Sequence, residues 1–475
     1  MTDTPAGSGA PPGDEGVENT ATRVLERART GELSLIWFLY ADHGGIIRGK
    51  ASSLSALGER LRTGIGHTVA MMAMPMLDNL QPVEGLGPVG EVRIMPDPAT
   101  FAPLPYAPGA AAMTADLVRP GGEPWEACPR TFLKDAIAGL AAEGYALSAA
   151  FEPEFTLGRR LADPSGSGAP DQLVPADDSL CYSATGFHLA HDYAVELAAA
   201  LEAQGMQVEH YYPELGPGQQ EMSVRHAPAL RAADNHVLYR ETVRGVAFRR
   251  GMWASLAPKP IADQAGNGAH LHASLWDLPG GHNVFYDPGD RYQLSEAGYH
   301  FIGGLLAHLP ALTALTCGSV NSFRRLAPQM WSSAYTVYGM DNREAAVRIC
   351  SPMRGDPEGS VNLELKPSDS SANPYLALGA YIHAGLDGIR SKIDPGEAVN
   401  ADPATLTDAE RSRVGARRLP ESLAQALDAL EADDLLMEAL GPLRRRGYLA
   451  VKRADVAAFA DHDAAYECFH HFTKI

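Results

Sequence analysis

The chain has 475 residues, of which 45% are hydrophobic and 20% charged, and its formal net charge is −19. This length predicts two or more domains with large cores, and the acidic charge argues against a nucleic acid or an anionic membrane as the main partner. No apolar run reaches transmembrane length and the N-terminus does not resemble a signal peptide, so we expect a cytoplasmic protein. The five cysteines lack paired spacing, so we expect neither disulfides nor a zinc site.

The N-terminal part of the chain predicts a small, mostly β domain. Residues 1–19 are rich in Gly, Pro, Thr and Ala and are expected to form a disordered tail, and a helix is expected over residues 18–29. Strand-like runs at 34–40 and 46–50 flank the turn sequence Asp42-His43-Gly44-Gly45, which predicts a β-hairpin. A short helix (55–63), a Met-rich run (70–76) and two strands (91–97 and 111–117) follow, so this domain is placed at residues 20–120.

A run of Gly and Pro at residues 119–124 marks a boundary, and residues 121–475 predict one large domain beyond it. Strand-like and helix-like patterns are mixed along it, which indicates an α+β fold. The expected helices cover residues 129–144, 193–204, 229–251, 382–389, 420–440 and 453–460, and a Gly/Pro/Ser loop covers residues 163–171.

The sequence Phe151-Glu152-Pro153-Glu154-Phe155 follows an apolar run and predicts a strand. Side chains alternate along a strand, so Glu152 and Glu154 share one face and the two Phe side chains share the other. Two neighbouring carboxylates repel each other and need solvent, a proton, a cation or a metal ion nearby. For this pair alone, a solvated face is the ordinary explanation.

Three further stretches add polar side chains of the same kind. Glu214 and Glu221 flank a Gly-Pro-Gly turn, and a predicted strand places His270, His272 and Ser274 on one face. A second predicted strand places Asn362, Glu364 and Lys366 on one face. Together the five carboxylates and one imidazole suit a hard divalent cation such as Mg²⁺ or Mn²⁺.

Arginines gather in a later part of the chain, at Arg324, Arg325, Arg343 and Arg348. Guanidinium groups match carboxylates and phosphates, so metals and arginines together predict a phosphoryl-transfer site. The chain has no Walker-type loop and is not predicted to be a P-loop enzyme. Pairing of each Arg with a surface acid remains the alternative.

At this point the chain resembles the glutamine synthetases of type I, from the hairpin at Asp42 to the C-terminus. The motifs that carry the resemblance, in family order, are Glu152-Pro153-Glu154-Phe155, Pro217-Gly218-Gln219-Gln220-Glu221, Pro258-Lys259-Pro260, His270-Leu271-His272, Asn321-Ser322-Phe323-Arg324-Arg325-Leu326 and Ser371-Ala372-Asn373-Pro374-Tyr375-Leu376. The resemblance implies a small β-grasp-like N-terminal domain and a large catalytic domain built on an antiparallel sheet funnel. It also implies a homo-oligomer, a dodecamer of two hexameric rings, in which a neighbour's N-terminal domain completes each site.

The resemblance further implies an ATP-dependent ligase that binds two or more Mg²⁺ or Mn²⁺ ions per site. One metal would be held by Glu154, Glu214 and Glu221, and the other by Glu152, His270 and Glu364. The residues on the ATP side would be Glu209, His272, Ser274 and Arg348. Glutamate and its phosphorylated γ-carboxylate would lie against Gly266, Arg325 and Arg343, and the catalytic residues would be Arg325, Arg343 and Glu364.

Trp331 departs from the family pattern. In ammonia-using members an acid lies six residues after the second basic residue of the Asn-Ser motif, and here that position is Trp331. A second acid comes from an N-terminal loop, but residues 66–72 contain none. Ammonium is a cation and needs negative charge to bind and to lose its proton. We therefore expect a γ-glutamylamide synthetase that takes an organic amine, with an apolar or aromatic amine favoured.

Several alternatives stay open on the amine side. Trp331 could serve packing alone, and a cation–π contact could hold a small alkylammonium. An ordinary glutamine synthetase that uses ammonia and a non-catalytic structural homologue are the competing hypotheses.

Two other departures concern the acid substrate and regulation. Lys366 stands where the family usually has an Arg on the substrate carboxylate, and Ala265 replaces an Asn that commonly contacts glutamate, so the acid would be held differently or would not be glutamate. The region that matches the adenylylated Tyr of the family, residues 403–407, contains no Tyr, so no regulation by adenylylation is expected.

Overall fold

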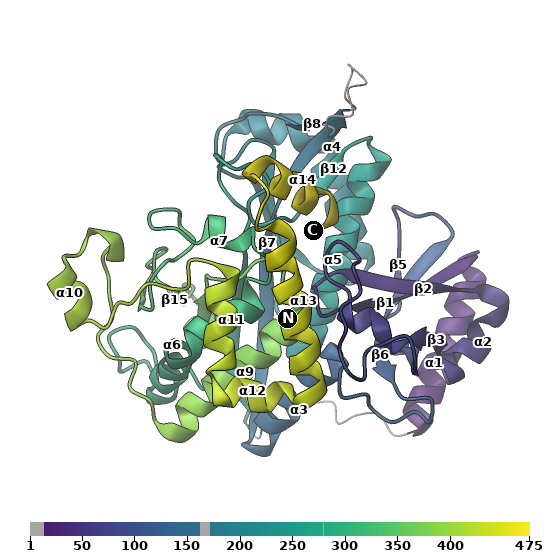
Figure 1. Cartoon of the computed structure of the whole chain (residues 1–475), viewed down its shortest axis with the longest axis horizontal. Coiled ribbons are helices and arrows are strands. Elements are labelled where there is room, and N and C mark those ends of the chain that lie inside the picture. Colours follow the sequence, from purple (N-terminus) through teal and green to yellow (C-terminus); the bar gives the residue numbers. More distant parts are fainter. Residues whose placement is uncertain (1–13, 162–171, 279) are drawn as a thin grey trace.

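The computed structural model describes residues 14–161, 172–278 and 280–475. In Figure 1 a small N-terminal domain (purple) lies beside a larger domain, and the long strand β7 (Tyr145–Leu161) runs through the middle of the larger one. This arrangement confirms the predicted α+β fold. The predicted loop at 163–171 and the first thirteen residues of the predicted tail lie outside the described residues.

The N-terminal sheet has the strand order β2-β1-β6-β4-β3 within the described residues, and β5 pairs with β6. Its strands are β1 (Leu35–Ala41), β2 (Ile47–Ser53), β3 (Ile65–Thr68), β4 (Glu91–Pro96), β5 (Ala102–Pro103) and β6 (Ala110–Val118). The predicted hairpin is confirmed, because β1 and β2 pair in antiparallel fashion from Leu35 opposite Ser53 to Ala41 opposite Ile47. β1 runs parallel to β6, which makes the sheet mixed.

Short helices accompany this sheet. They are α1 (Asp14–Thr30), α2 (Leu54–Thr63), and the 3₁₀ turns η1 (Val69–Ala73) and η2 (Pro98–Thr100). The Met-rich run forms η1 and the loop after it, and Met72 is buried in the small core with Ile36, Phe38 and Met113. Its place in the core agrees with the packing role that flexible methionine side chains usually have.

The larger domain is built on a mainly antiparallel sheet with the described order β14-β15-β16-β13-β7-β10-β9. Three short strands, β8, β11 and β12, also pair with β7. The bounds are β8 (Gln172–Pro175), β9 (Val208–Pro213), β10 (Gln219–Val224), β11 (Ala227–Pro228), β12 (Trp253–Ser255), β13 (Ala269–Asp277), β14 (Tyr338–Met340), β15 (Val347–Cys350) and β16 (Asn362–Leu365). Only β14 and β15 are parallel among these described pairs.

The remaining described helices belong to the larger domain. They are α3 (Pro129–Ala142), α4 (Ala184–Ala203), α5 (Ala229–Arg249), α6 (Glu296–Thr316), α7 (Ser322–Arg325), α8 (Pro357–Ser360), α9 (Pro374–Ser391), η3 (Pro403–Thr405), α10 (Asp408–Arg413), α11 (Leu423–Glu431), α12 (Asp434–Leu440), α13 (Pro442–Phe459) and α14 (Ala464–Lys474). The helix expected over 420–440 is two helices, α11 and α12, and the long helix α6 was not predicted. α10 lies at the far left of the molecule, away from the N-terminal domain (Figure 1).

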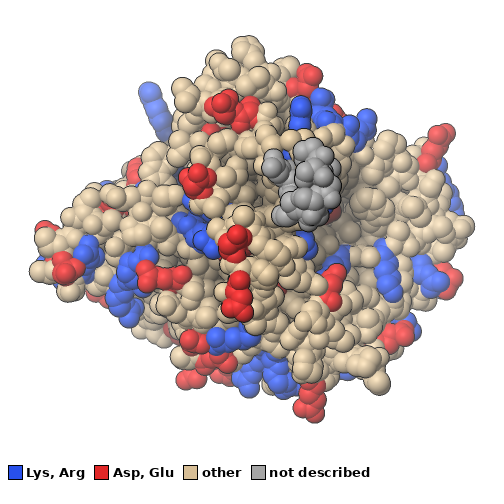
Figure 2. Space-filling model, turned by 45° about the horizontal axis from the view of Figure 1, so that its top comes forward, with Lys and Arg blue, Asp and Glu red and all other residues tan. Residues whose placement is uncertain are grey.

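The face alternation predicted for β7 positions the site. Phe151 and Phe155 are buried in the main core, so Glu152 and Glu154 point to the opposite face of the sheet. On the molecular face seen in Figure 2, basic and acidic side chains are interspersed over a mostly uncharged surface. No helix within the described ranges is both long and apolar enough to span a bilayer.

Candidate active site

The register of the larger sheet brings the predicted carboxylates and histidines together. On β7, Glu154 lies opposite Glu221 of β10, and Glu152 lies opposite His270 of β13. Further along β13, His272 lies opposite Glu364 of β16. Since residues two apart on a strand share a face, these side chains form rows across one face of the sheet.

One group of side chains surrounds His270. Its Nδ1 lies 3.4 Å from Oε2 of Glu152 and 3.3 Å from Oε1 of Glu364. Its Nε2 lies 3.0 Å from Nη2 of Arg325 and 3.5 Å from Nζ of Lys366. Arg and Lys can only donate, so Nε2 must accept and the proton lies on Nδ1, between the two carboxylates. This is the position that a cation would take between Glu152 and Glu364.

His272 faces the same two carboxylates from the next row. Its Nε2 lies 3.3 Å from Oε2 of Glu152 and 3.7 Å from Oε1 of Glu364, and its Nδ1 lies 2.9 Å from Oδ1 of Asn362. Arg348 lies on the outer side of this group, with its Nε 2.5 Å from Oε2 of Glu364. The predicted nucleotide-side residues His272 and Arg348 therefore adjoin the Glu152–Glu364 pair.

A second group contains Glu154, Glu214 and Glu221. Oε2 of Glu154 accepts hydrogen bonds from Nε2 of Gln219 (2.8 Å) and from the backbone N–H of Gly268 (3.1 Å). Glu221 is buried and accepts a hydrogen bond from the hydroxyl of Tyr212. Glu214 lies at the start of the β9–β10 turn, where its Oε2 accepts from its neighbour's backbone N–H. Glu154 lies farther from its nearest basic partner than Glu364 does, since Nε2 of His270 is 3.9 Å from Oε1 of Glu154, whereas Nε of Arg348 is 2.5 Å from Oε2 of Glu364.

The pKa values of the carboxyl groups differ between Glu154 and Glu221 on one side and Glu364 on the other. Burial raises the pKa of Glu154 to about 7, with Glu214 adding to the shift, and burial also raises the pKa of Glu221, to which the charge of Glu152 contributes. Burial would also raise the pKa of Glu364, but the charges of Lys366 and the histidines outweigh it and hold that pKa at about 2. A cation bound at the Glu154–Glu221 group would favour the ionised carboxylates over the protonated ones, and oxygen ligands of this kind fit a divalent cation.

The predicted substrate-side residues occupy the neighbouring loop and strand end. Arg325 is only 4% exposed, and its guanidinium lies against His270. Lys366 is 3% exposed, with its Nζ 3.4 Å from Oε1 of Glu364. The carbonyl of Gly266 accepts a hydrogen bond from Gln219, and a Cβ at this position would lie 2.3 Å from the Pro258 carbonyl, so a side chain does not fit.

Two predicted nucleotide-side residues lie away from the carboxylate group. Glu209 is next to His210 on β9 and therefore points to the opposite face, where its Oε1 lies 3.8 Å from Nε of Arg225. Ser274 lies one row beyond His272 on β13 and accepts a hydrogen bond from the indole of Trp276.

Exposed apolar side chains flank the acidic group. Tyr182 is 60% exposed, and its backbone N–H bonds to the carbonyl of Pro213, next to Glu214. Leu215, the neighbour of Glu214 on the other side, is 61% exposed. Trp331 is 60% exposed, and its backbone N–H donates to Oε1 of Glu344, the neighbour of Arg343. The charge of Arg343 offsets part of the rise in the pKa of Glu214 that burial causes.

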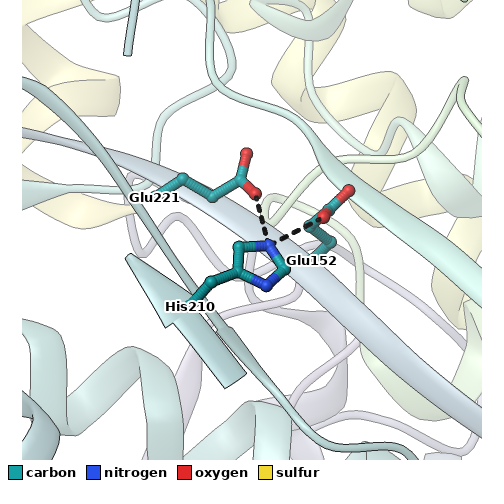
Figure 3. A group of neighbouring side chains, drawn as sticks. All are labelled: Glu152, His210 and Glu221. Carbon is teal, nitrogen blue, oxygen red and sulfur yellow. Dashed lines mark ion pairs between the residues drawn. The ribbon is translucent and has the colours of Figure 1, made fainter. Parts of the chain in front are cut away.

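The structure also adds a histidine that sequence reasoning missed. His210 on β9 lies opposite Ser223 on β10, and its Nε2 lies 3.9 Å from Oε1 of Glu152 and 4.0 Å from Oε1 of Glu221 (Figure 3). Each of these three residues offers a potential metal-ligand atom, and the three atoms lie within 4.8 Å of one another, as do those of Glu152, His272 and Glu364. The sequence offered one indication, since His210 shares its strand face with Tyr212, but the strand register was needed to place it.

Comparisons with known proteins give a consistent result. Residues 126–470 match the family model of the glutamine synthetase catalytic domain, and residues 19–125 match that of the glutamine synthetase N-terminal domain. A gamma-glutamylpolyamine synthetase of Streptomyces coelicolor, GlnA3, is 38% identical over 88% of this chain and 89% of its own length. A glutamine synthetase of Halobacterium salinarum is 36% identical over 81% of this chain and 83% of its own length. The crystal structure of a novel glutamine synthase homologue superposes with a TM-score of 0.81 at 34% identity, over 93% of this chain and 99% of that chain.

Proposed function

The chain belongs to the glutamine synthetase family of ATP-dependent ligases, and from that premise we propose that it joins the γ-carboxylate of glutamate to an organic amine. In the proposed reaction an oxygen of the γ-carboxylate attacks the γ-phosphorus of ATP, which releases ADP and leaves a γ-glutamyl phosphate. The amine nitrogen then attacks the acyl carbon and loses a proton, and phosphate leaves. The observation that carries the amine assignment is an aromatic side chain, Trp331, at the position where ammonia-using relatives have an acid.

We propose that two groups of side chains hold divalent cations, Mg²⁺ or Mn²⁺. Glu154, Glu214 and Glu221 would form one group, and Glu152, His270 and Glu364 the other. The fit is supported by the donor set, five carboxylates and one imidazole, and by the raised pKa of the buried Glu154 and Glu221. The chemistry that such cations supply is neutralisation of phosphate charge.

The chain's own basic residues would do the rest of the charge compensation. Arg325 lies next to His270, so it can reach an anion bound beside the second group. Arg343, whose charge lowers the pKa of Glu214, would offset the charge of the phosphorylated γ-carboxylate. His272, Ser274 and Arg348 are proposed to contact ATP, with Glu209 as a further contact. Lys366, a point charge and not a fork, is proposed to hold the acid substrate.

An apolar or aromatic amine is favoured by the rim of the site. Tyr182 and Leu215 offer exposed apolar surface beside Glu214, and Trp331 is exposed as well; a carbon skeleton would gain contact area on such side chains that ammonia cannot use. The S. coelicolor relative is named for a polyamine product, which supports an organic amine over ammonia. A polyamine carries several positive charges and would need several carboxylates nearby. Glu214 and the buried Glu344 provide less acidic surface than that.

A panel of amines tests the proposal. Purified protein is given ATP, Mg²⁺ or Mn²⁺ and glutamate with ammonia, isopropylamine, 2-phenylethylamine, putrescine or spermidine, and phosphate release is measured while the product is identified by mass. The expected result is a γ-glutamylamide of an apolar or aromatic amine, with the highest kcat/KM. A highest kcat/KM with ammonia would refute the amine assignment, and a highest value with a polyamine would refute the apolar preference.

The competing candidate is a glutamine synthetase that uses ammonia. The retained carboxylate of Glu214 beside Tyr182 favours it, because a carboxylate can bind ammonium, and the H. salinarum relative is a glutamine synthetase. The same panel separates the two.

We also propose a homo-oligomer, a dodecamer of two six-membered rings, on the strength of the family membership. Native mass spectrometry should give a mass of twelve chains, and a monomer or dimer would contradict it.

A further inference from the structure

The two carboxylate oxygens of Glu152 face different partners. Oε2 faces the histidines of β13, at 3.4 Å from His270 and 3.3 Å from His272. Oε1 faces the other way, at 3.9 Å from Nε2 of His210 and 3.5 Å from the hydroxyl of Ser223. A carboxylate with its oxygens directed to two separate groups of donors is suited to bridge two cations.

His210 is held in its orientation by its neighbours on the sheet. It lies opposite Ser223, whose hydroxyl is 2.9 Å from Nε2, and its ring stacks on Tyr212 with an interplanar angle of 4° and a centroid distance of 5.6 Å. Tyr212 in turn donates its hydroxyl hydrogen to Glu221. The imidazole therefore points Nε2 at the space between Glu152 and Glu221, as Figure 3 shows.

We propose that His210 is a metal ligand, and that its Nε2 holds a divalent cation together with Oε1 of Glu152 and Oε1 of Glu221. This inference rests on the proposed function, since it adds a ligand to the metal ions which that function needs. Adjacent and opposite ligands of a six-coordinate cation lie roughly 3.0 and 4.2 Å apart at metal–ligand distances near 2.1 Å. Nε2 lies 3.9 and 4.0 Å from the two carboxylates, and because only one ligand can lie opposite Nε2, at least one carboxylate would move toward the imidazole by about 1 Å when the cation binds.

A nitrogen ligand changes which metal the site prefers. Mg²⁺ takes oxygen ligands and keeps its waters, whereas imidazole suits transition metals. The site with His210 should therefore bind Mn²⁺, and still more Co²⁺ or Zn²⁺, in preference to Mg²⁺. The proposed site formed by Glu154, Glu214 and Glu221 has only oxygen donors among its predicted ligands. It should therefore not show this preference.

The competing explanation is a hydrogen bond without a metal. The Ser223 hydroxyl lies 2.9 Å from His210, 3.5 Å from Glu152 and 3.4 Å from Glu221, so it could bridge the three groups by itself. In that case His210 would contribute to stability and not to metal affinity.

The test measures metal binding without turnover. Chelator-treated protein, with no ATP, glutamate or amine, is titrated with Mn²⁺ and separately with Mg²⁺ by calorimetry, and free Mn²⁺ is followed by electron paramagnetic resonance. The variant His210→Gln replaces the ring nitrogen by an amide, and His191→Gln, at an exposed position on α4, is the matched control. His210 has a side chain that is 52% exposed, so the variant should fold, and His210→Asn serves as a second variant.

In His210→Gln we expect the affinity for one equivalent of Mn²⁺ to fall by about 10- to 100-fold. Losses of this size are typical even when the mutated residue only hydrogen-bonds to a metal ligand. Mg²⁺ affinity should change by less than about threefold, and His191→Gln should match the wild type. Mn²⁺ isotherms of His210→Gln that match those of His191→Gln would overturn the inference. An equal fall of the thermal midpoint in metal-free Ser223→Ala and His210→Gln would then assign His210 to the hydrogen-bond network. Failure of the proposed function would instead appear as absent amide synthesis in a protein whose Mn²⁺ binding is intact.

Discussion

Position 331 is where a single side chain has the largest consequence for the proposed reaction. Trp331 has φ of 55°, an uncommon value for a bulky residue, and its backbone N–H is fixed by Glu344. The loop thus exposes an indole at the position that the proposed function assigns to the acid of ammonia-using relatives. An indole provides contact area for carbon but no carboxylate to take a proton, so it favours amines that are neutral or that bind by their apolar part.

Replacing Trp331 by Glu should shift the preference of the enzyme toward ammonia. The new carboxylate would attract ammonium and accept its proton, so kcat/KM for ammonia should rise by about tenfold or more, and that for the best organic amine should fall by a similar factor, as general-base groups typically contribute ~10²–10⁴-fold. Met330→Glu, one residue away and 43% exposed, is the control for added charge. Equal ammonia kinetics in the two variants would show that the indole does not decide the nucleophile.

Among the structural elements, the β9–β10 turn has the tightest geometric requirement in the site. Gly218 adopts φ of +67°, and a Cβ there would lie 2.3 Å from the carbonyl oxygen of Leu157. Leu157 belongs to β7, the strand that also carries Glu154. The turn carries Glu214 and leads into β10, which carries Glu221. Glycine is therefore needed both for the left-handed backbone and for the close approach to β7.

The substitution Gly218→Ala tests this requirement against a position of the same backbone conformation. Gly251 also has φ of +67°, but a Cβ there meets no atom within 4 Å. Gly251→Ala should cost about 1–2 kcal/mol for the left-handed conformation alone, and Gly218→Ala should cost about 1–3 kcal/mol more because the turn must move. Urea denaturation gives both values, and Mn²⁺ titration should show weaker binding in Gly218→Ala alone. Equal losses in the two variants would contradict the clash.

A second element-level contact joins three helices. On α6, His308 has its Nδ1 2.7 Å from Oδ2 of Asp433, the N-cap of α12, and its Nε2 3.3 Å from Oδ2 of Asp387 on α9. The hydrogen bond with Asp433 is the main reason that the pKa of His308 is raised, with burial opposing it. A raised pKa in the folded state stabilises the protonated form, so this stabilisation is complete below the unfolded pKa of about 6.5 and is lost as the pH rises through the folded value.

We therefore expect His308→Gln to reduce stability most at low pH. The loss should be about 1–3 kcal/mol at pH 6, the range for hydrogen bonds to charged groups, and smaller at pH values above the raised folded pKa, where the wild-type imidazole loses its proton. Thermal midpoints measured from pH 5.5 to 9.5 should converge at the alkaline end, while His191→Gln should follow the wild type throughout. A His308→Gln deficit that stays constant with pH would mean that protonation plays no part.

The elements also show what sequence reasoning could reach. β7, β13 and β16 were predicted because their side chains alternate, with Glu152 and Glu154 on one face and Phe151 and Phe155 on the other. α6 was missed because its sequence is apolar on nearly all sides and contains Gly303, Gly304 and Pro310, which resemble breakers. The structure uses Gly304 for close packing, since a Cβ there would lie 2.1 Å from the Ala384 carbonyl of α9. His210 was missed for a different reason, because its role depends on a cross-strand neighbour 13 residues away.

At the scale of the whole molecule, one buried side chain joins the two domains. Arg130 on α3 is 2% exposed, and its guanidinium donates to Asp234 of α5 (2.9 Å), to Asp97 after β4 (2.7 Å) and to Asp116 of β6 (3.1 Å). Two of these carboxylates belong to the small sheet domain and one to the larger domain. The domains are thus connected by a network centred on this guanidinium, in which Asp116 also pairs with Lys134 (2.6 Å) and Asp234 also accepts from the hydroxyl of Tyr375 (2.7 Å).

Removing this cation should uncouple the domains. Arg130→Met leaves Asp234, itself 2% exposed, without its guanidinium partner, and loss of one member of a buried ion pair costs about 3–5 kcal/mol. Arg119→Met removes an exposed pair with Glu126 and should cost less than about 1 kcal/mol, which makes it the matched control.

Calorimetry should show a separate transition of the N-terminal domain at lower temperature in Arg130→Met. Limited proteolysis should cut this variant between the domains, near residues 119–124. A single unshifted transition in Arg130→Met would mean that the remaining contacts between the domains suffice, among them the hydrogen bonds that Asn373 donates to the carbonyls of Ala41 and Asp42. Since the N-terminal domain is proposed to complete a neighbouring subunit's site, the uncoupled variant should also lose amide synthesis while keeping the Mn²⁺ binding of its own sheet.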